Sequence, residues 1–82
     1  MQNLTTVETD AVAWLRTELE DPEISGDDNF LDVGGHSLTF AKLNAYLGDA
    51  HGVALDMRTT YDESLAVAVA KLQPLQTQGT AQ

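Results

Sequence analysis

The sequence contains no cysteine. A disulfide framework and a thiolate metal site are therefore excluded, and a reducing compartment is compatible with the composition. Basic residues are also scarce: four Lys and Arg stand against 13 Asp and Glu, for a formal charge of −9. Nucleic acid and anionic membranes are poor partners for such a chain, whereas complementary charge favours basic protein surfaces. The acidity is equally explained as a means of keeping a small protein soluble.

Long apolar runs are missing as well. No run approaches the roughly 20 residues that a membrane-spanning helix needs. The first four residues, MQNL, lack the basic and apolar regions of a signal peptide. We therefore expect a cytoplasmic protein. The 82 residues suffice for one small domain with a thin core, which leaves little room for an enclosed active site.

Apolar residues recur at helical spacing near the N-terminus. Thr5 and Glu8 match a capping box, with Thr5 as the N-cap. The apolar face that follows consists of Leu4, Val7, Ala11, Leu15 and Leu19. Pro22 lies beyond the end of this helix, and residues 21–36 are typical of a long loop. A loop of this length is rarely unpacked, so we expect its apolar residues to contact the core: Ile24, Phe30, Leu31 and Val33.

A second helix is expected to begin at Ser37 and to end at Gly52. Its apolar residues form two stripes. One stripe consists of Leu38, Ala41 and Ala45, and the other of Phe40, Leu43, Leu47 and Ala50. A helix with this pattern either lies at the centre of the fold or exposes one stripe for binding.

The C-terminal part predicts a short helical turn at residues 59–63 and a further helix after Ser64. The alternation of Leu65, Val67 and Val69 also fits a strand, but no second strand is expected to pair with it. The intervening alanines favour a helix, and Ser64 is a good N-cap.

The expected fold class is therefore all-α, a small bundle of three main helices and one short helix with a long loop between the first two. We place one domain at residues 1–75, since Pro74 ends the last helix. The polar tail at residues 76–82 is expected to be disordered.

Residues 32–38, DVGGHSL, place two glycines and a histidine ahead of a serine. A hydrolase elbow is not supported, because Thr39 stands where the last glycine belongs and no strand precedes the serine. A phosphate loop is not supported either, since no Gly-Lys-Ser/Thr follows the glycines. A calcium loop starting at Asp27 would place Leu38 at the glutamate position. We expect no catalytic residue and no metal site; the simplest alternative makes Ser37 an N-cap.

The wider segment at residues 28–38, DNFLDVGGHSL, resembles the modification site of phosphopantetheine-dependent carrier proteins. It is most similar to the peptidyl carrier proteins, or thiolation domains, of nonribosomal peptide synthesis, whose usual pattern is DNFFDLGGHSL. Leu31 and Val33 are mild departures from it. The expected order of helices agrees with the family over residues 4–72, so the resemblance implies an acyl-carrier-like bundle.

The resemblance implies that Ser37 receives 4′-phosphopantetheine covalently from coenzyme A. A separate phosphopantetheinyl transferase would supply the magnesium and most of the chemistry. The thiol of the arm would hold an aminoacyl or acyl group as a thioester. The implied further partners are an adenylation or other loading enzyme and condensation, tailoring or thioesterase enzymes. A serine at a helix N-terminus suits this role, since a phosphate there lies beside unpaired N–H groups.

The resemblance also suggests a docking surface for partner enzymes. Its candidate residues are His36, Leu38, Ala41, Lys42, Met57 and Tyr61. His36 is typical of peptidyl carriers, because fatty-acid-type carriers usually have Asp there, and Lys42 favours the same class. Helical core is the alternative for the apolar members, local packing for His36 and a solvated side chain for Lys42.

Two residues and one short segment are compared separately with the family pattern. Asp32 matches the family pattern, and we expect it to cap or hold the loop. His51 stands where the family often has phenylalanine, and we expect a partly buried, hydrogen-bonded side chain. Residues 59–64 lack a proline that is common in the family and are about one residue short, so the short helix and its contacts are the least predictable part.

We therefore expect a monomeric carrier and not an enzyme, serving a nonribosomal peptide or hybrid natural-product pathway such as antibiotic biosynthesis. Met1 lies almost on the first helix and the chain ends soon after the last, which favours a free-standing carrier that works in trans over an excised synthetase domain. Two other hypotheses remain: a polyketide-type acyl carrier, and an unmodified helical interaction module.

Overall fold

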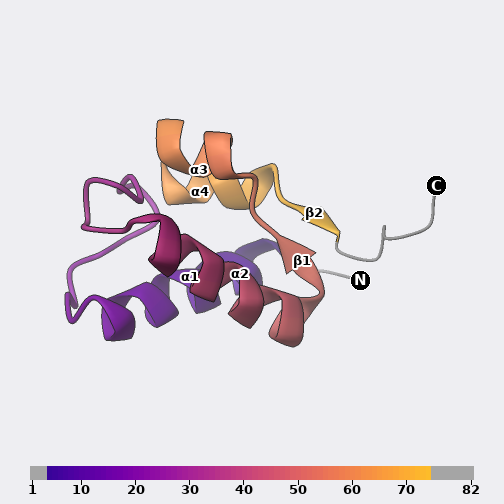
Figure 1. The fold of residues 1–82 in the computed structure, drawn as a ribbon, viewed down its shortest axis with the longest axis horizontal. Helices are drawn as coiled ribbons and strands as arrows, with labels where there is room; N and C mark the ends of the chain where they lie inside the picture. Colours follow the sequence, from indigo (N-terminus) through magenta and orange to yellow (C-terminus); the bar gives the residue numbers. More distant parts are fainter. Residues whose placement is uncertain (1–3, 75–82) are drawn as a thin grey trace.

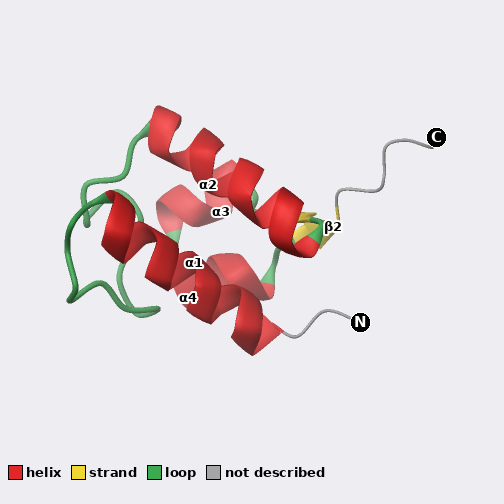
Figure 2. Cartoon of the chain, turned by 90° about the horizontal axis from the view of Figure 1, so that it is seen from below, coloured by secondary structure: helices red, strands yellow, loops and turns green. Residues whose placement is uncertain are grey.

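The structure is a computed structural model in which residues 4–74 are described. In chain order its elements are α1 (Leu4–Glu18), α2 (Ser37–His51), β1 (Val53–Ala54), α3 (Met57–Asp62), α4 (Leu65–Ala70) and β2 (Gln73–Pro74). Helices α1 and α2 lie side by side in one layer, and α3 and α4 form a second layer above them in Figure 1. This second layer lies behind the first in Figure 2. The expectation of a small, mainly helical bundle is confirmed.

The lengths of the helices differ from the expectation of three main helices and one short one. Helices α1 and α2 have 15 residues each, whereas α3 and α4 have six each. The last helix is short because the chain leaves it at Lys71 to form β2, which pairs antiparallel with β1. The alanine content and the Ser64 cap correctly predicted a helix here. The prediction that Pro74 ends it is wrong, because the helix ends at Ala70 and Pro74 lies in β2, in a long-range pairing with Val53.

Helix α1 begins at Leu4, so Thr5 lies inside the helix and the predicted N-cap at Thr5 is wrong. A threonine followed three residues later by a glutamate also occurs within helices, and the pattern alone does not separate the two cases. The predicted face is confirmed by the complete or nearly complete burial of Val7, Ala11 and Leu15.

One hydrophobic core joins α1, the long loop, α2, the segment around β1, and α4. Its members are Val7, Ala11, Val12, Leu15, Ile24, Phe30, Phe40, Leu43, Leu47, Val53, Leu55, Leu65, Ala68 and Val69. The loop contributes Ile24 and Phe30 as expected, and Val33 packs partly against the core. Leu31 was expected to contact the core but is 44% exposed, because the turn that buries Phe30 directs the next side chain outward.

The two stripes of α2 have different environments. Phe40, Leu43 and Leu47 are buried in the core, whereas Ala50, which was expected on the same stripe, is exposed. The other stripe, formed by Leu38, Ala41 and Ala45, is exposed. Of the two alternatives, the structure therefore favours a helix with one exposed stripe. The helix ends at Gly52 as predicted, in a left-handed conformation (φ 70°) with its N–H donating to the Gly48 carbonyl.

Three side-chain pairs cross the seam between α1 and α2 at intervals of about one turn. In order along α1 they are Asp10 with His51 (Oδ2 to Nε2, 2.8 Å), Trp14 with Tyr46 (stacked, ring centroids 6.3 Å apart), and Glu18 with Lys42 (Oε2 to Nζ, 3.4 Å). The order shows that the two helices run in opposite directions. It also confirms that His51 is partly buried and hydrogen-bonded.

Short polar interactions define the second layer. Asp56 caps α3, since its Oδ2 accepts hydrogen bonds from the Thr59 N–H and hydroxyl, each at 2.9 Å. Helix α3 therefore begins two residues before the predicted turn and does form without the proline. Ser64 caps α4 as predicted, its hydroxyl oxygen accepting from the Val67 N–H.

The predicted tail at residues 76–82 lies outside the described residues. Within residues 4–74, no helix is long and apolar enough to cross a membrane.

Candidate functional site

Ser37 is the first residue of α2, and its side chain is exposed. The N-cap of the helix is His36, whose side chain makes no capping hydrogen bond. The alternative in which Ser37 serves as the N-cap is therefore wrong. The first backbone bond of the helix is donated by the Phe40 N–H to the His36 carbonyl at 2.8 Å. This register leaves the start of the helix open next to the serine hydroxyl.

The open helix start supplies hydrogen-bond donors. Among residues 4–74, the N–H groups of Ser37, Leu38 and Thr39 have no backbone acceptor, and the Ser37 hydroxyl has no side-chain hydrogen bond. Unpaired N–H groups at a helix N-terminus, together with the helix dipole, favour a negatively charged group. A phosphate bonded to the Ser37 Oγ therefore fits this position.

The two glycines before Ser37 are each required, but for different physical reasons. Gly34 adopts a φ of 104°, which side-chain-bearing residues rarely adopt. Gly35 lies against the ring of Phe30, and a Cβ at Gly35 would lie 2.5–2.7 Å from three ring carbons. One glycine is required by backbone conformation and the other by close packing, so the turn before Ser37 is specified by its sequence.

Phe30 anchors this turn in the core. It is fully buried, its ring stacks on Tyr61 at 5.9 Å, and it meets Phe40 edge-on at 6.0 Å. Phe40 and Tyr61 also meet edge-on at 5.8 Å. These three rings join the loop to α2 and to α3, so the segment that precedes Ser37 is fixed from both sides.

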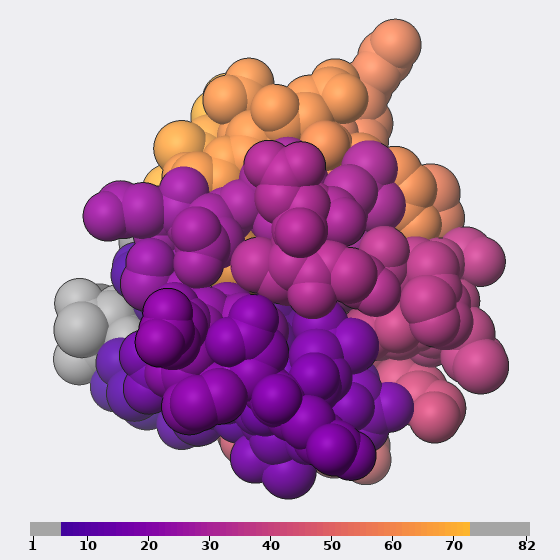
Figure 3. Space-filling model, turned by 90° about the vertical axis from the view of Figure 1, so that its left-hand side faces the viewer, coloured from indigo at the N-terminus to yellow at the C-terminus, as the bar shows by residue number. Residues whose placement is uncertain are grey.

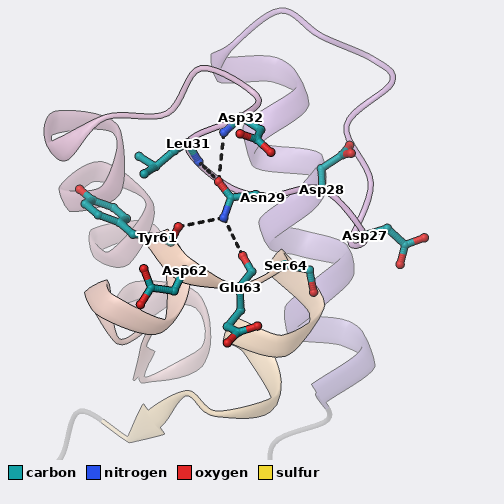
Figure 4. Close-up of a pocket in the computed structure, with 9 residues that line it drawn as sticks. All are labelled: Asp27, Asp28, Asn29, Leu31, Asp32, Tyr61, Asp62, Glu63 and Ser64. Carbon is teal, nitrogen blue, oxygen red and sulfur yellow. Dashed lines mark hydrogen bonds between the residues drawn. The ribbon is translucent and has the colours of Figure 1, made fainter.

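Asn29 is a residue that sequence reasoning did not single out. Its Nδ2 donates to the carbonyls of Tyr61 and Glu63 at 2.9 Å each, and its Oδ1 accepts from the N–H groups of Leu31 (2.8 Å) and Asp32 (3.1 Å). Figure 4 shows the side chain at the centre of these four contacts. Asparagine often bonds to nearby backbone in turns, and this was the available signal. Its partners at the α3–α4 junction were not predictable locally.

The backbone of the loop also contacts α4. The Leu65 N–H donates to the Asp28 carbonyl, and the Ala66 N–H donates to the Gly26 carbonyl, both at 2.8 Å. Figure 3 shows the loop, coloured purple to magenta, lying across the face between α1 and the orange C-terminal helices. The long loop is therefore a packed part of the fold.

An open hollow of about 530 Å³ lies between this loop and the α3–α4 junction. Nine residues line it: Asp27, Asp28, Asn29, Leu31, Asp32, Tyr61, Asp62, Glu63 and Ser64 (Figure 4). Asp32 was expected to hold the loop, but its side chain is exposed and makes no hydrogen bond with a described residue. Asn29 holds the loop instead. In the described chain, no group of three or more His, Cys, Asp or Glu residues could hold a metal ion.

The candidate docking residues lie near Ser37 with different exposures. His36, Ala41 and Lys42 are exposed, as are Leu38 (59%) and Met57 (50%). Their exposure removes the core alternative for Leu38, Ala41 and Met57.

Tyr61 and Lys42, the other two docking candidates to consider, each contact a defined neighbour. Tyr61 is half-buried against Phe30 and Phe40, so only part of its side chain is available to a partner. Lys42 is paired with Glu18 rather than merely solvated, but an exposed pair of this kind is worth only about 0–1 kcal/mol.

The carboxyl of Asp56, at the start of α3, has a lowered pKa. Two hydrogen bonds from Thr59, first from its backbone N–H and then from its hydroxyl, hold the pKa of the Asp56 carboxyl below its ordinary value of 3.8. The nearby Arg58 charge acts in the same direction. Asp56 immediately precedes Met57, so the cap fixes the backbone from which this exposed side chain projects.

Comparison with known proteins agrees with this geometry. Residues 13–71 match the model of a protein family described as "Phosphopantetheine attachment site". The chain is 38% identical over 55 residues to the phosphinothricin tripeptide synthetase PhsB of Streptomyces viridochromogenes. It is 33% identical over 63 residues to CymA of Salinispora arenicola, a probable non-canonical nonribosomal peptide synthetase.

These matches cover 60% and 77% of this chain but only 5% and 1% of the two synthetases. No solved structure matches the chain. The matched segment of the family includes Ser37, its loop and all of α2. The chain therefore belongs to the family of phosphopantetheine-binding carrier domains, which carry 4′-phosphopantetheine covalently, and it is homologous to domains of nonribosomal peptide synthetases.

Proposed function

We propose that this protein is a peptidyl carrier and not an enzyme, and that the Ser37 Oγ is its attachment atom. The observation that carries this proposal is the exposed Ser37 hydroxyl at the open N-terminus of α2. The arm, once attached, supplies a terminal thiol that holds an aminoacyl group as a thioester. The absence of cysteine from the chain is no obstacle, because the thiol belongs to the cofactor.

The attachment reaction exchanges one bond to phosphorus for another. The Ser37 Oγ–P bond forms, and the P–O bond between the two phosphorus atoms of coenzyme A breaks. Adenosine 3′,5′-bisphosphate leaves, and the serine proton passes to a base of the transferase. The N–H groups at the start of α2 lie where the resulting phosphodiester carries its negative charge.

In this proposal the loading enzyme, and not the carrier, selects the cargo. The large hollow of this chain is open and carries five carboxylates, so it is poorly suited to enclosing an acyl group. We propose that an adenylating enzyme, supplied in trans, selects an amino acid and loads it. Condensation, tailoring or thioesterase enzymes then receive it.

Docking of these enzymes is proposed for the exposed stripe that begins beside Ser37. Leu38 and Ala41 on α2 and Met57 on α3 offer apolar contacts, with His36, Lys42 and the exposed part of Tyr61 around them. Exposed apolar side chains next to a modification site are suited to transient contacts with partners. A surface of this kind allows several enzymes to reach the same serine in turn.

The first experiment is intact-mass analysis of the unmodified protein after incubation with coenzyme A, magnesium and a broad-specificity phosphopantetheinyl transferase. The wild type is expected to gain one phosphopantetheine. The Ser37→Ala variant is expected to fold, by circular dichroism, and to gain nothing. No gain by folded wild-type protein, or a gain by the variant, contradicts the proposal.

A second experiment tests the class of cargo. The modified protein is offered an amino acid with ATP and a nonribosomal adenylating enzyme, or an acyl-coenzyme A with a polyketide acyltransferase. Aminoacyl thioester formation by the first route supports the peptidyl carrier. Loading only by the second route favours the polyketide alternative.

A further inference from the structure

We propose that Asn29 is a positioning residue for the modification of Ser37. The inference rests on the proposed role of Ser37 as the attachment residue. Asn29 is eight positions earlier in the chain and acts through the loop between them. Its side-chain amide joins that loop to the end of α3, and this junction determines where the start of α2 is presented to the transferase.

The bonds of the Asn29 amide point in two directions. On one side, Nδ2 donates to the carbonyls of Tyr61 and Glu63, which belong to the end of α3 and to the residue after it. On the other side, Oδ1 accepts from two N–H groups of its own loop, those of Leu31 and Asp32. Both polar atoms therefore make two bonds, and one side chain connects segments separated by more than 30 residues.

The loop beyond Asn29 continues towards Ser37 through backbone bonds alone. The Asn29 carbonyl accepts from the Val33 N–H at 3.2 Å, the Leu31 carbonyl from the Gly34 N–H at 3.1 Å, and the Phe30 carbonyl from the Gly35 N–H at 3.0 Å. The next residue, His36, is the N-cap of α2. Among side chains of the described loop residues 30–36, none adds a hydrogen bond to this series.

Loss of the Asn29 amide is therefore expected to leave the fold intact and to change how precisely Ser37 is positioned. The aromatic packing of Phe30 still holds the loop near the core, so the bundle is expected to fold. The turns between Asn29 and Gly35 lose their side-chain hydrogen bonds to the α3 end and keep only the stacking of Phe30 on Tyr61, so the position of Ser37 relative to the α3 surface becomes less defined. A small displacement of a reacting group can cost up to about 100-fold in rate.

The chain contains a matched control in Asn44. Its Nδ2 donates to the Leu55 carbonyl at 3.2 Å, and its Oδ1 accepts from the Leu55 N–H at 2.9 Å. It too joins two segments through one amide, but these are α2 and the stretch between β1 and α3. Replacing it removes two amide hydrogen bonds, and their partner, Leu55, lies outside residues 29–36.

The test measures initial rates of phosphopantetheine transfer from coenzyme A at varied carrier concentration, for the wild type, Asn29→Ala and Asn44→Ala. The assay temperature is chosen so that the wild type and both variants are folded, as judged from their urea unfolding curves. Asn29→Ala is expected to lower kcat about 10- to 100-fold with KM changed less than threefold. Asn44→Ala is expected to stay within twofold of the wild type in both constants.

A second variant, Asn29→Asp, covers the case in which Asn29→Ala does not fold. It keeps an acceptor for the loop N–H groups but cannot donate to the α3 carbonyls, so kcat is expected to fall here too. Equal kcat values for the Asn29 and Asn44 variants, or an effect confined to KM, overturn the inference. Failure of the wild type to be modified contradicts the role of Ser37 instead, so the two failures are distinct.

Discussion

Gly35 shows how one residue before the modified serine is specified by packing. Its φ is not in the left-handed region, unlike that of Gly34, so a side chain at Gly35 is disfavoured by space and not by backbone conformation. The space is occupied by the Phe30 ring, which is fully buried and held by two other aromatic rings. Because that ring has nowhere to move, the constraint on Gly35 is steric.

The replacement of Gly35 by alanine is predicted to destabilise the protein by about 1–3 kcal/mol, the usual range for overpacking. Urea unfolding at equilibrium measures the change. In a Phe30→Leu background the same replacement is expected to cost less, because the smaller side chain leaves room for a Cβ. Strictly additive effects of the two substitutions would contradict this account, since residues in contact normally couple.

Helix α2 illustrates what is decided at the scale of an element. One stripe fills the core and the other is exposed, so the helix both supports the fold and presents Ser37. The burial of Phe40, Leu43 and Leu47 sets its rotation relative to the core. Helix α3 is much shorter and depends on its cap, because six residues provide few intrahelical bonds.

The cap of α3 predicts a pH dependence for this element. The pKa of Asp56 is lower in the folded protein than its ordinary value, so the ionised carboxylate stabilises the folded state. This contribution is complete above the ordinary pKa of 3.8 and is lost as the pH falls through the lower, folded value. An NMR titration of the Asp56 carboxyl carbon is expected to give a midpoint below 3.8.

The Thr59→Ala variant provides the control for this titration. It removes the hydroxyl donor but keeps the backbone N–H, which is the larger cause of the shift. The midpoint is therefore expected to rise towards its ordinary value without reaching it. A wild-type midpoint at or above 3.8 would show that the cap does not form in solution.

The whole molecule is dominated by negative charge. Ion pairs among residues 4–74 are those of Lys42 with Glu18 and, when the histidine is protonated, of His51 with Asp10. With 13 acidic and four basic residues, most carboxylates have no cation beside them. Repulsion among these charges opposes the compact state, and salt screens it.

Added sodium chloride is therefore predicted to raise the thermal unfolding midpoint. The Debye length falls from about 30 Å at 0.01 M to about 3 Å at 1 M, so the increase should occur across this range. The Lys42→Gln variant adds one unit of net negative charge and should depend more steeply on salt. A midpoint that falls with added salt would mean that attractive pairs outweigh the repulsion.

Local features of this protein were determined by the sequence itself. The buried face of α1, the glycine at the end of α2, the cap at Ser64 and the position of Ser37 at a helix start all follow from neighbours within a few residues. Such features depend on the helical period and on the conformations that single residues allow. The segment at residues 28–38 also identified the family, because its pattern is contiguous.

Other features were decided only by the tertiary structure, because they depend on residues distant in the chain. The pairing of β1 with β2 shortened α4, and the core selected which stripe of α2 is exposed. The contacts of Asn29 with Tyr61 and Glu63 cross 32 and 34 positions. Periodicity and capping patterns report local preference, whereas the choice between two apolar faces and the partners of a side-chain amide are set when the elements pack together.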